Sequence, residues 1–169
     1  MIKLYLDTNV FFNAYCPGEK NDIADWIFEL LKPEDKGDFM GITCELSVAE
    51  LFRAMKKQVN LGVIDEQVAQ TVVDFAIADI GEMVRERRLV LVPITYSRII
   101  EARSFIFGYN LYASDAIYAA VALQSGVACF ITFDSDFKEY LFDTPVLSAN
   151  SDDFKEGVEC LLVPPDTSP

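Results

Sequence analysis

The chain has 169 residues, of which 51% are hydrophobic and 24% charged, which is typical of one globular domain and excludes a disordered chain. Its formal net charge of -13 excludes a broadly basic nucleic-acid-binding surface, so any contact with a phosphate backbone needs local basic patches or a bound metal. Histidine is absent, which excludes catalysis by imidazole and the usual zinc sites.

The first half of the chain alternates short apolar runs with amphipathic stretches. Three strands are predicted here, over residues 2–6, 39–42 and 89–92. Three helices are predicted between them, over residues 21–31, 45–59 and 65–88. In the last of these helices we expect an inward apolar face made of Val68, Val72, Phe75 and Ala76.

The second half continues the alternation. A helix is predicted over residues 96–107, ending at Gly108, and another over 114–125 that is apolar almost all round and should therefore be central. A strand over 128–132, a short helix over 135–141 and a last short strand over 145–147 follow. We expect a single domain over residues 1–147 and a partly ordered C-terminal extension over residues 148–169.

Strands that alternate with helices predict an α/β fold, a three-layer sandwich with a central, mainly parallel sheet flanked by helices. In such a fold the ligand site lies at the carboxyl edge of the sheet. Asp7 directly follows the first strand and Asp134 follows the strand over 128–132, so both carboxylates should reach that edge.

The sequence also bears on the cellular compartment. The four cysteines show no C-x-x-C spacing, and Cys44 and Cys129 lie in apolar surroundings, which indicates buried, reduced thiols. The longest charge-free stretch, residues 116–133, is interrupted by Gly126 and does not predict a membrane span. No basic-then-apolar leader opens the chain, so we expect a cytoplasmic protein without a membrane contact.

Several acidic residues occupy positions where an ordinary role competes with a functional one. Asp7 can form a turn or helix cap, and Asp115 can complement the dipole of the helix that it begins. Asp134 and Asp136 can cap the next element, or Asp134 can bind a metal with Asp136 as a partner. If these carboxylates meet, they form an all-oxygen cluster that suits Mg²⁺ or Mn²⁺.

Glu50 has the plainest alternative explanation. It falls on the helical wheel opposite Val48, and a solvated pair with Arg53 three residues later explains it without a site. Basic residues are few in this chain. If the protein binds the backbone of a substrate, the basic cluster that follows Glu50 is a better candidate for that contact than the other basic residues of the chain. This cluster consists of Arg53, Lys56 and Lys57.

Four segments in order carry a resemblance to a known family: Leu6-Asp7-Thr8-Asn9, Ser47-Val48-Ala49-Glu50-Leu51, Ser114-Asp115-Ala116-Ile117-Tyr118-Ala119-Ala120 and Thr132-Phe133-Asp134-Ser135-Asp136-Phe137. This arrangement resembles the PIN-domain nucleases, most of all the VapC-type toxins of toxin–antitoxin modules. The resemblance covers roughly residues 2–147.

The resemblance implies an Mg²⁺- or Mn²⁺-dependent endoribonuclease with a PIN-like fold. It implies that Asp7, Glu50, Asp115 and Asp134 form the acidic, metal-binding quartet, with Asp136 as an additional carboxylate. It further implies that the site is supported by Thr8, Asn9, Ser47 and Thr132. In such enzymes a metal-bound water attacks the phosphorus and leaves a 5′-phosphate and a 3′-hydroxyl.

Partners follow from the same resemblance. VapC-like proteins cleave RNA, commonly form homodimers, and are inhibited by antitoxins that insert a basic residue into the acidic pocket. The face of Val68, Val72 and Phe75 could serve one of these contacts or pack in the core. Two other functions stay open: a PIN-fold binding module with weak or no nuclease activity, and an Asp-x-Asp phosphatase or receiver domain. The second is disfavoured because Asp7-Thr8-Asn9 lacks the second aspartate.

Overall fold

The computed structural model describes residues 1–19, 21–32, 38–135, 137, 140–141 and 143–162. The strands of this part are β1 (Ile2–Leu6), β2 (Phe39–Cys44), β3 (Leu89–Val92), β4 (Cys129–Thr132), β5 (Tyr140–Leu141) and β6 (Thr144–Ser148). Its helices are α1 (Thr8–Tyr15), α2 (Asp22–Leu30), α3 (Glu45–Asn60), α4 (Glu66–Arg85), α5 (Tyr96–Tyr109), α6 (Ala113–Ser125) and α7 (Phe154–Cys160).

The strands form one sheet in the order β3-β2-β1-β4-β6-β5. The first five strands of this order are parallel, and β5 alone runs antiparallel, to β6. In the register, Leu6 of β1 lies beside Ile131 of β4, so these two strands end together. The residues that follow them, Asp7 and Asp134, therefore emerge at the same edge of the sheet.

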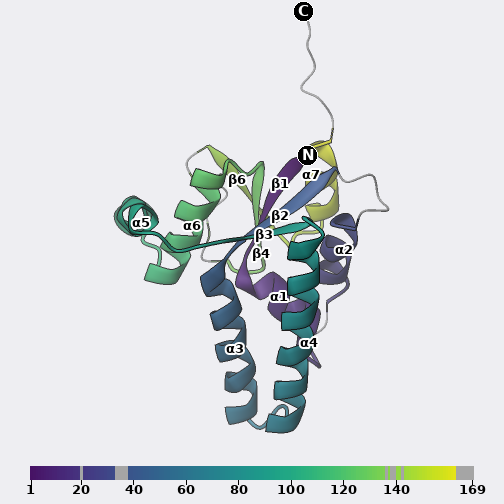
Figure 1. The fold of residues 1–169 in the computed structure, drawn as a ribbon. Helices are drawn as coiled ribbons and strands as arrows, with labels where there is room; N and C mark the ends of the chain where they lie inside the picture. The colour runs from purple at the N-terminus through teal and green to yellow at the C-terminus, as the bar shows by residue number, and fades with distance from the viewer. Residues whose placement is uncertain (20, 33–37, 136, 138–139, 142, 163–169) are drawn as a thin grey trace, which may run out of the picture.

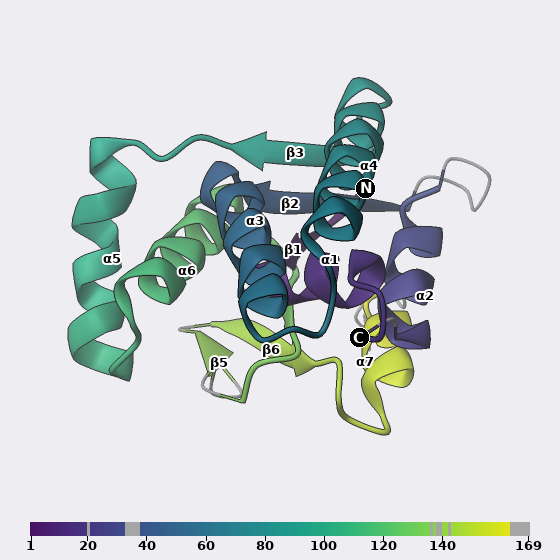
Figure 2. The same cartoon turned by 90° about the horizontal axis from the view of Figure 1, so that it is seen from below.

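Helices cover both faces of the sheet and give the three-layer sandwich that the sequence predicts (Figures 1 and 2). On one face, α1, α2, α3, α4 and α7 enclose a core that contains Leu4, Leu6 and Ile131. On the other face, α5 and α6 enclose a second core around Tyr5 and Phe130. The apolar helix α6 lies directly on the sheet, as expected, and α5 packs outside it (Figure 2).

Three predicted boundaries were wrong. β2 extends to Cys44 because Thr43 and Cys44 pair with the ends of β3. α5 continues through Gly108 to Tyr109 and ends at Asn110, whose φ of 57° is one that asparagine tolerates. The helix predicted over 135–141 is replaced at its end by β5, because Leu141 pairs with Thr144 of β6; residues 136 and 138–139 lie outside the described residues.

The inward face of α4 also differs from the prediction. Val68 is 39% exposed and Phe75 is 63% exposed, while the buried positions are Ala69, Ala76, Ile80 and Met83. Of the predicted face, Ala76 is buried and Val72 is partly buried against the core, so the packed side of α4 overlaps the predicted one only in part. The two helices form a hairpin that extends away from the sheet (Figure 1).

The C-terminal segment adds a helix, α7, that packs against the body of the domain. Phe154 and Val158 of α7 are buried in the same core as α1 and α2. The ring of Phe154 meets the ring of Trp26 edge to face at a centroid distance of 5.9 Å. In the part of the chain that the structure describes, no helix combines the length and the apolar character needed to cross a membrane.

Candidate active site

Asp7 is the centre of the candidate site. It follows β1, caps the N-terminus of α1, and is 4% exposed. Its Oδ1 accepts a hydrogen bond from the backbone N–H of Thr8 at 2.7 Å. Its Oδ2 accepts bonds from Asn9 Nδ2 at 2.8 Å and from Thr132 Oγ1 at 2.7 Å. A carboxylate that is buried in this way needs such donors, because burying it bare would cost several kcal/mol.

A network of side-chain hydrogen bonds fixes the geometry around Asp7. Thr132 Oγ1 donates its proton to Asp7 and accepts bonds from Asn9 Nδ2 at 3.0 Å and from the backbone N–H of Asp134 at 2.9 Å. Asn9 Oδ1 accepts a bond from the backbone N–H of Phe133 at 2.9 Å. All the hydrogen-bonding capacity of the Thr132 hydroxyl is thus used, and the start of α1 is bound to the end of β4.

The electrostatics of Asp7 reveal its acidic neighbours. Burial raises the pKa of Asp7 from 3.8 to about 7, against the opposite effect of the hydrogen bonds from Thr132 and Thr8. The charges of Asp115 and Asp134 raise the pKa of Asp7 further. Carboxylates from three separate segments therefore lie within electrostatic reach of one another.

Asp115 and Asp134 are the two carboxylates whose charges act on Asp7. Asp115 is half-buried in the first turn of α6, where Ser114 Oγ lies 3.4 Å from its Oδ1. Asp134 is half-buried directly after β4, and its backbone N–H is held by Thr132. Asp136, the additional carboxylate expected from the sequence, lies outside the described residues.

Glu50 lies close enough to Tyr118 for its charge to act on that hydroxyl. It is half-buried on α3, and among the described residues no ion pair joins it to Arg53, which is exposed. Burial raises the pKa of Tyr118, the hydrogen bond with Thr8 lowers it, and the charges of Glu50 and Asp7 raise it again. The Tyr118 hydroxyl accepts a bond from Thr8 Oγ1 at 3.3 Å, and the charges of both Glu50 and Asp7 act on it.

Tyr118 is a site residue that the sequence reasoning missed. It is buried, and it lies three residues after Asp115, so both side chains project from the same face of α6. That spacing was the available signal, but in a helix that is apolar almost all round a tyrosine is an ordinary core residue.

The other predicted supporting and basic residues have partners other than Asp7 or are exposed. Ser47 is buried, and its Oγ lies 3.1 Å from Thr43 Oγ1, which also donates to the backbone oxygen of Leu6 at 2.8 Å. Lys56 forms an ion pair with Glu66 at 2.8 Å. Arg53 and Lys57 are exposed on α3.

The donor set suits a hard divalent cation in its chemistry. Asp7, Asp115, Asp134 and Glu50 offer only oxygen ligands, and a cation would relieve the repulsion that raises the pKa of Asp7. Within the described residues, no group of three acidic or cysteine side chains is already arranged to hold an ion. The site therefore provides the ligand types, with one buried carboxylate held rigidly and the others around it.

Comparisons with known proteins place this fold in a family. The family model of the PIN domain matches residues 4–142. A chain in the crystal structure of VapBC2 from Rickettsia felis, bound to a DNA fragment from its promoter, superposes with a TM-score of 0.57 at 16% identity, over 86% of this chain and 97% of that one. A chain of a toxin–antitoxin complex from Klebsiella pneumoniae gives a TM-score of 0.57 at 16% identity, over 88% of this chain and 98% of that one.

A third solved structure, from Pyrobaculum aerophilum, has a TM-score of 0.54 at 16% identity and covers 80% of this chain and 76% of that one. No curated protein matches the sequence. At such identities the structures establish a shared fold, while the family model covers most of the chain. The chain belongs to the PIN domain family.

Proposed function

We propose that this protein is a metal-dependent endoribonuclease and the toxin of a type II toxin–antitoxin pair. The observation that carries the proposal is the buried Asp7 carboxylate at the carboxyl edge of the sheet, with the charges of Asp115 and Asp134 acting on it. Membership of the PIN family, whose members are generally nucleases, supports phosphodiester hydrolysis. The similarity in fold to chains of toxin–antitoxin complexes supports the toxin role.

The chain's own residues have distinct tasks in this proposal. Asp7 and Asp115 would bind Mg²⁺ or Mn²⁺ directly, and Glu50 and Asp134 would complete the shell. The hydrogen bonds from Asn9 and Thr132 hold Oδ2 of Asp7, while among the described residues Oδ1 accepts one bond, from Thr8, and keeps a lone pair for a ligand. A metal held there would supply positive charge for the phosphate and would lower the pKa of a bound water. Arg53, Lys56 and Lys57 are the proposed contacts to the RNA backbone.

The direct test is cleavage of a mixed RNA pool by the purified protein with Mn²⁺, Mg²⁺ or EDTA. We expect cleavage with either metal, none with EDTA, and products that carry a 5′-phosphate and a 3′-hydroxyl. The absence of cleavage under all conditions would contradict the nuclease.

A binding module with the PIN fold is the second candidate function. It is favoured by the net charge of -13 and by the open arrangement of acidic side chains in the described residues. Calorimetric titration with Mn²⁺ separates the two functions. A nuclease should bind the metal at millimolar concentration or below, whereas the binding module predicts neither metal binding nor cleavage of any RNA.

Glu50→Gln tests the residue whose role the sequence left most open. The substitution removes the charge that acts on Tyr118 but keeps the size of the side chain, so the fold should persist. We expect RNA cleavage to fall by about 10–100-fold, the effect typical of disturbing the surroundings of a metal. Glu45→Gln, at an exposed position of the same helix, is the matched control and should retain full activity. Equal activity of the two variants would remove Glu50 from the site.

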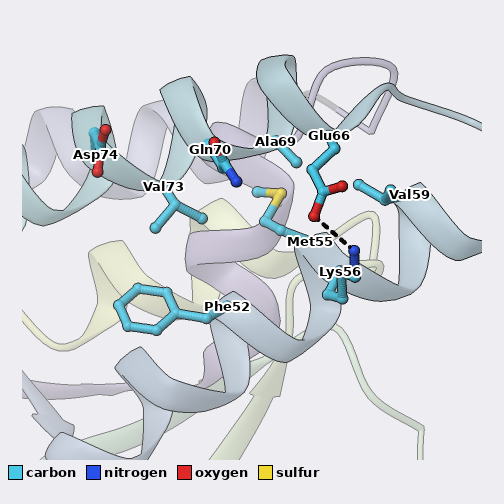
Figure 3. Close-up of a pocket in the computed structure, with 9 residues that line it drawn as sticks. All are labelled: Phe52, Met55, Lys56, Val59, Glu66, Ala69, Gln70, Val73 and Asp74. Atoms are coloured by element: carbon cyan, nitrogen blue, oxygen red, sulfur yellow. Dashed lines mark hydrogen bonds and ion pairs between the residues drawn. The ribbon is translucent and has the colours of Figure 1, made fainter.

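A groove between α3 and α4 supports the proposed antitoxin contact (Figure 3). It has a volume of about 330 Å³, and Phe52, Met55 and Val73 face the space between the helices. The Lys56–Glu66 ion pair lies at one end and the exposed Asp74 at the other. An apolar helix face with a basic flank complements this surface. Co-purification with the product of a neighbouring small gene tests the pairing, and loss of RNA cleavage in the complex is expected.

A homodimer is proposed through α5, whose outer face is apolar and exposed in the part of the chain that the structure describes. The stripe follows helical spacing and consists of Tyr96, Ile99, Ile100, Ile106 and Phe107, the last of which is 84% exposed. The charged residues of α5 are Arg98, Arg103 and Glu101, so this helix carries a net charge of +1. Two copies of an acidic chain can meet there with less repulsion than elsewhere.

Phe107→Asp should therefore convert the protein from dimer to monomer at micromolar concentration. Light scattering after gel filtration measures the change in mass, and Ser104→Asp, an exposed position beside the stripe, is the matched control. A monomeric wild-type protein, or a Phe107→Asp variant that remains dimeric, would contradict this interface.

A further inference from the structure

A second cavity begins at Asp134 and extends under the C-terminal segment. It has a volume of about 390 Å³, within the range of small-molecule sites of about 300–1,000 Å³. One wall is β6, with Pro145, Val146 and Leu147, and the other is the start of α7, with Phe154 and Gly157. The cavity therefore joins a candidate site residue to a helix that lies beyond the segment matched by the family model.

The lining of this cavity divides into an apolar interior and a polar mouth. Phe137 and Phe154 are buried, and together with Leu147 they form the apolar part. Asp134, Ser135, Ser148, Ser151 and Asp153 supply carboxylate and hydroxyl groups. Two carboxylates would repel a phosphate, so the lining favours a flat, neutral group that is apolar on its faces and carries N–H donors on its edge.

The polar groups are partly preorganised. Ser151 Oγ donates a hydrogen bond to Asp153 Oδ1, which leaves the second oxygen of this carboxylate without a partner among the described residues. The turn before α7 is fixed by the bond from the backbone N–H of Phe154 to the backbone oxygen of Ser151, and the first turn of α7 by the bond from Gly157 to Asp153. Gly157 also keeps the cavity open towards β6, since a Cβ there would lie 3.3 Å from Leu147 Cδ2.

We propose that this cavity binds one unstacked RNA base that carries an exocyclic amino group, next to the phosphodiester cleaved at the Asp7 cluster. Enzymes that act on single-stranded RNA read splayed bases by hydrogen bonds to the base edges. Carboxylates accept hydrogen bonds from amino groups, such as N4 of cytosine. Uracil carries a carbonyl oxygen where cytosine has the amino group, so its only donor on this edge is the ring N3–H, and a carboxylate placed at the amino group of cytosine would repel that oxygen. The base-binding role depends on the proposed ribonuclease function.

A titration with nucleosides tests the cavity independently of catalysis. Trp26 is the only tryptophan of the chain, and its ring packs on Phe154, so its fluorescence should report an occupant. In metal-free buffer we expect cytidine to bind at least about tenfold more tightly than uridine, the difference that one good base contact provides. Asp153→Asn replaces an acceptor by a donor and should remove or reverse that preference. Asp152→Asn removes the same charge from a neighbouring exposed residue outside the cavity and should leave the preference unchanged.

The cleavage sites in a randomised RNA pool provide the second measurement. The wild-type protein should avoid uracil at one position beside the cut, and Asp153→Asn should restore uracil there, whereas Asp152→Asn should leave both the rate and the pattern of cleavage unchanged. Ser151→Ala, which releases the Asp153 carboxylate, should weaken the preference as well. Equal binding of cytidine and uridine, no binding of either, or an unchanged preference in Asp153→Asn would overturn the base site. If no RNA is cleaved but cytidine is still preferred, the nuclease proposal fails and the cavity remains a nucleoside site.

Discussion

Asp7→Asn is expected to lower Mn²⁺-dependent RNA cleavage by about 10³-fold or more, because it removes the charge of the most buried carboxylate of the site. Stabilisation of transition-state charge by a metal is worth several kcal/mol, and each 1.4 kcal/mol corresponds to about a tenfold change in rate. The measurement is the initial rate of cleavage of a labelled RNA at saturating Mn²⁺, with calorimetric titration of Mn²⁺ in parallel.

The fold of the variant must be shown to persist for this result to be meaningful. Asparagine can still accept the bond from the backbone N–H of Thr8, and circular dichroism should match the wild-type protein. Asp22→Asn, an exposed position in the first turn of α2, is the charge-matched control and should cleave RNA normally. Undiminished cleavage by a well-folded Asp7→Asn protein would refute the assignment of the site.

Stability should fall as pH rises, and Asp7 is the cause. Its pKa is raised from 3.8 to about 7 in the folded protein, so the folded state holds a proton that the unfolded chain has already released. This stabilisation is complete below about pH 4 and is lost as pH rises through 7. At 1.36 kcal/mol per pKa unit the total is about 4 kcal/mol, of which about 3 kcal/mol lies between pH 5 and pH 8.

Urea unfolding in EDTA at pH 5 and pH 8, at one protein concentration, measures this difference. In Asp7→Asn the difference should shrink by about 3 kcal/mol, because the titrating group is gone while the remaining acidic residues stay. Adding Mn²⁺ at pH 8 should stabilise the wild-type protein and leave the variant nearly unaffected. A pH dependence that is the same in both proteins would show that Asp7 is not the group responsible.

The overall architecture followed from local patterns. Short apolar runs separated by amphipathic stretches identified strands and helices, and their alternation predicted a parallel sheet covered on both faces. The prediction held for β1 and β6, and for α6, whose apolar residues leave no solvent-facing side. It held only in part for α4, where Ala76 is buried as predicted but Val68 and Phe75 are exposed. Local spacing cannot decide which face packs when two are available.

For the candidate site, too, the sequence predicted one part and the tertiary structure decided the other. The sequence by itself determined that Asp7 and Asp134 each follow a strand of a mainly parallel sheet, and that a cluster of these carboxylates would offer a metal oxygen ligands. Only the tertiary structure decided that the two strands are neighbours, that Glu50 comes close enough to act on Tyr118, and that α7 returns to form a cavity with Asp134. The physical reason is that strand ends follow from hydrophobic periodicity within a few residues, whereas the side of a helix that meets a site depends on partners far away in the chain.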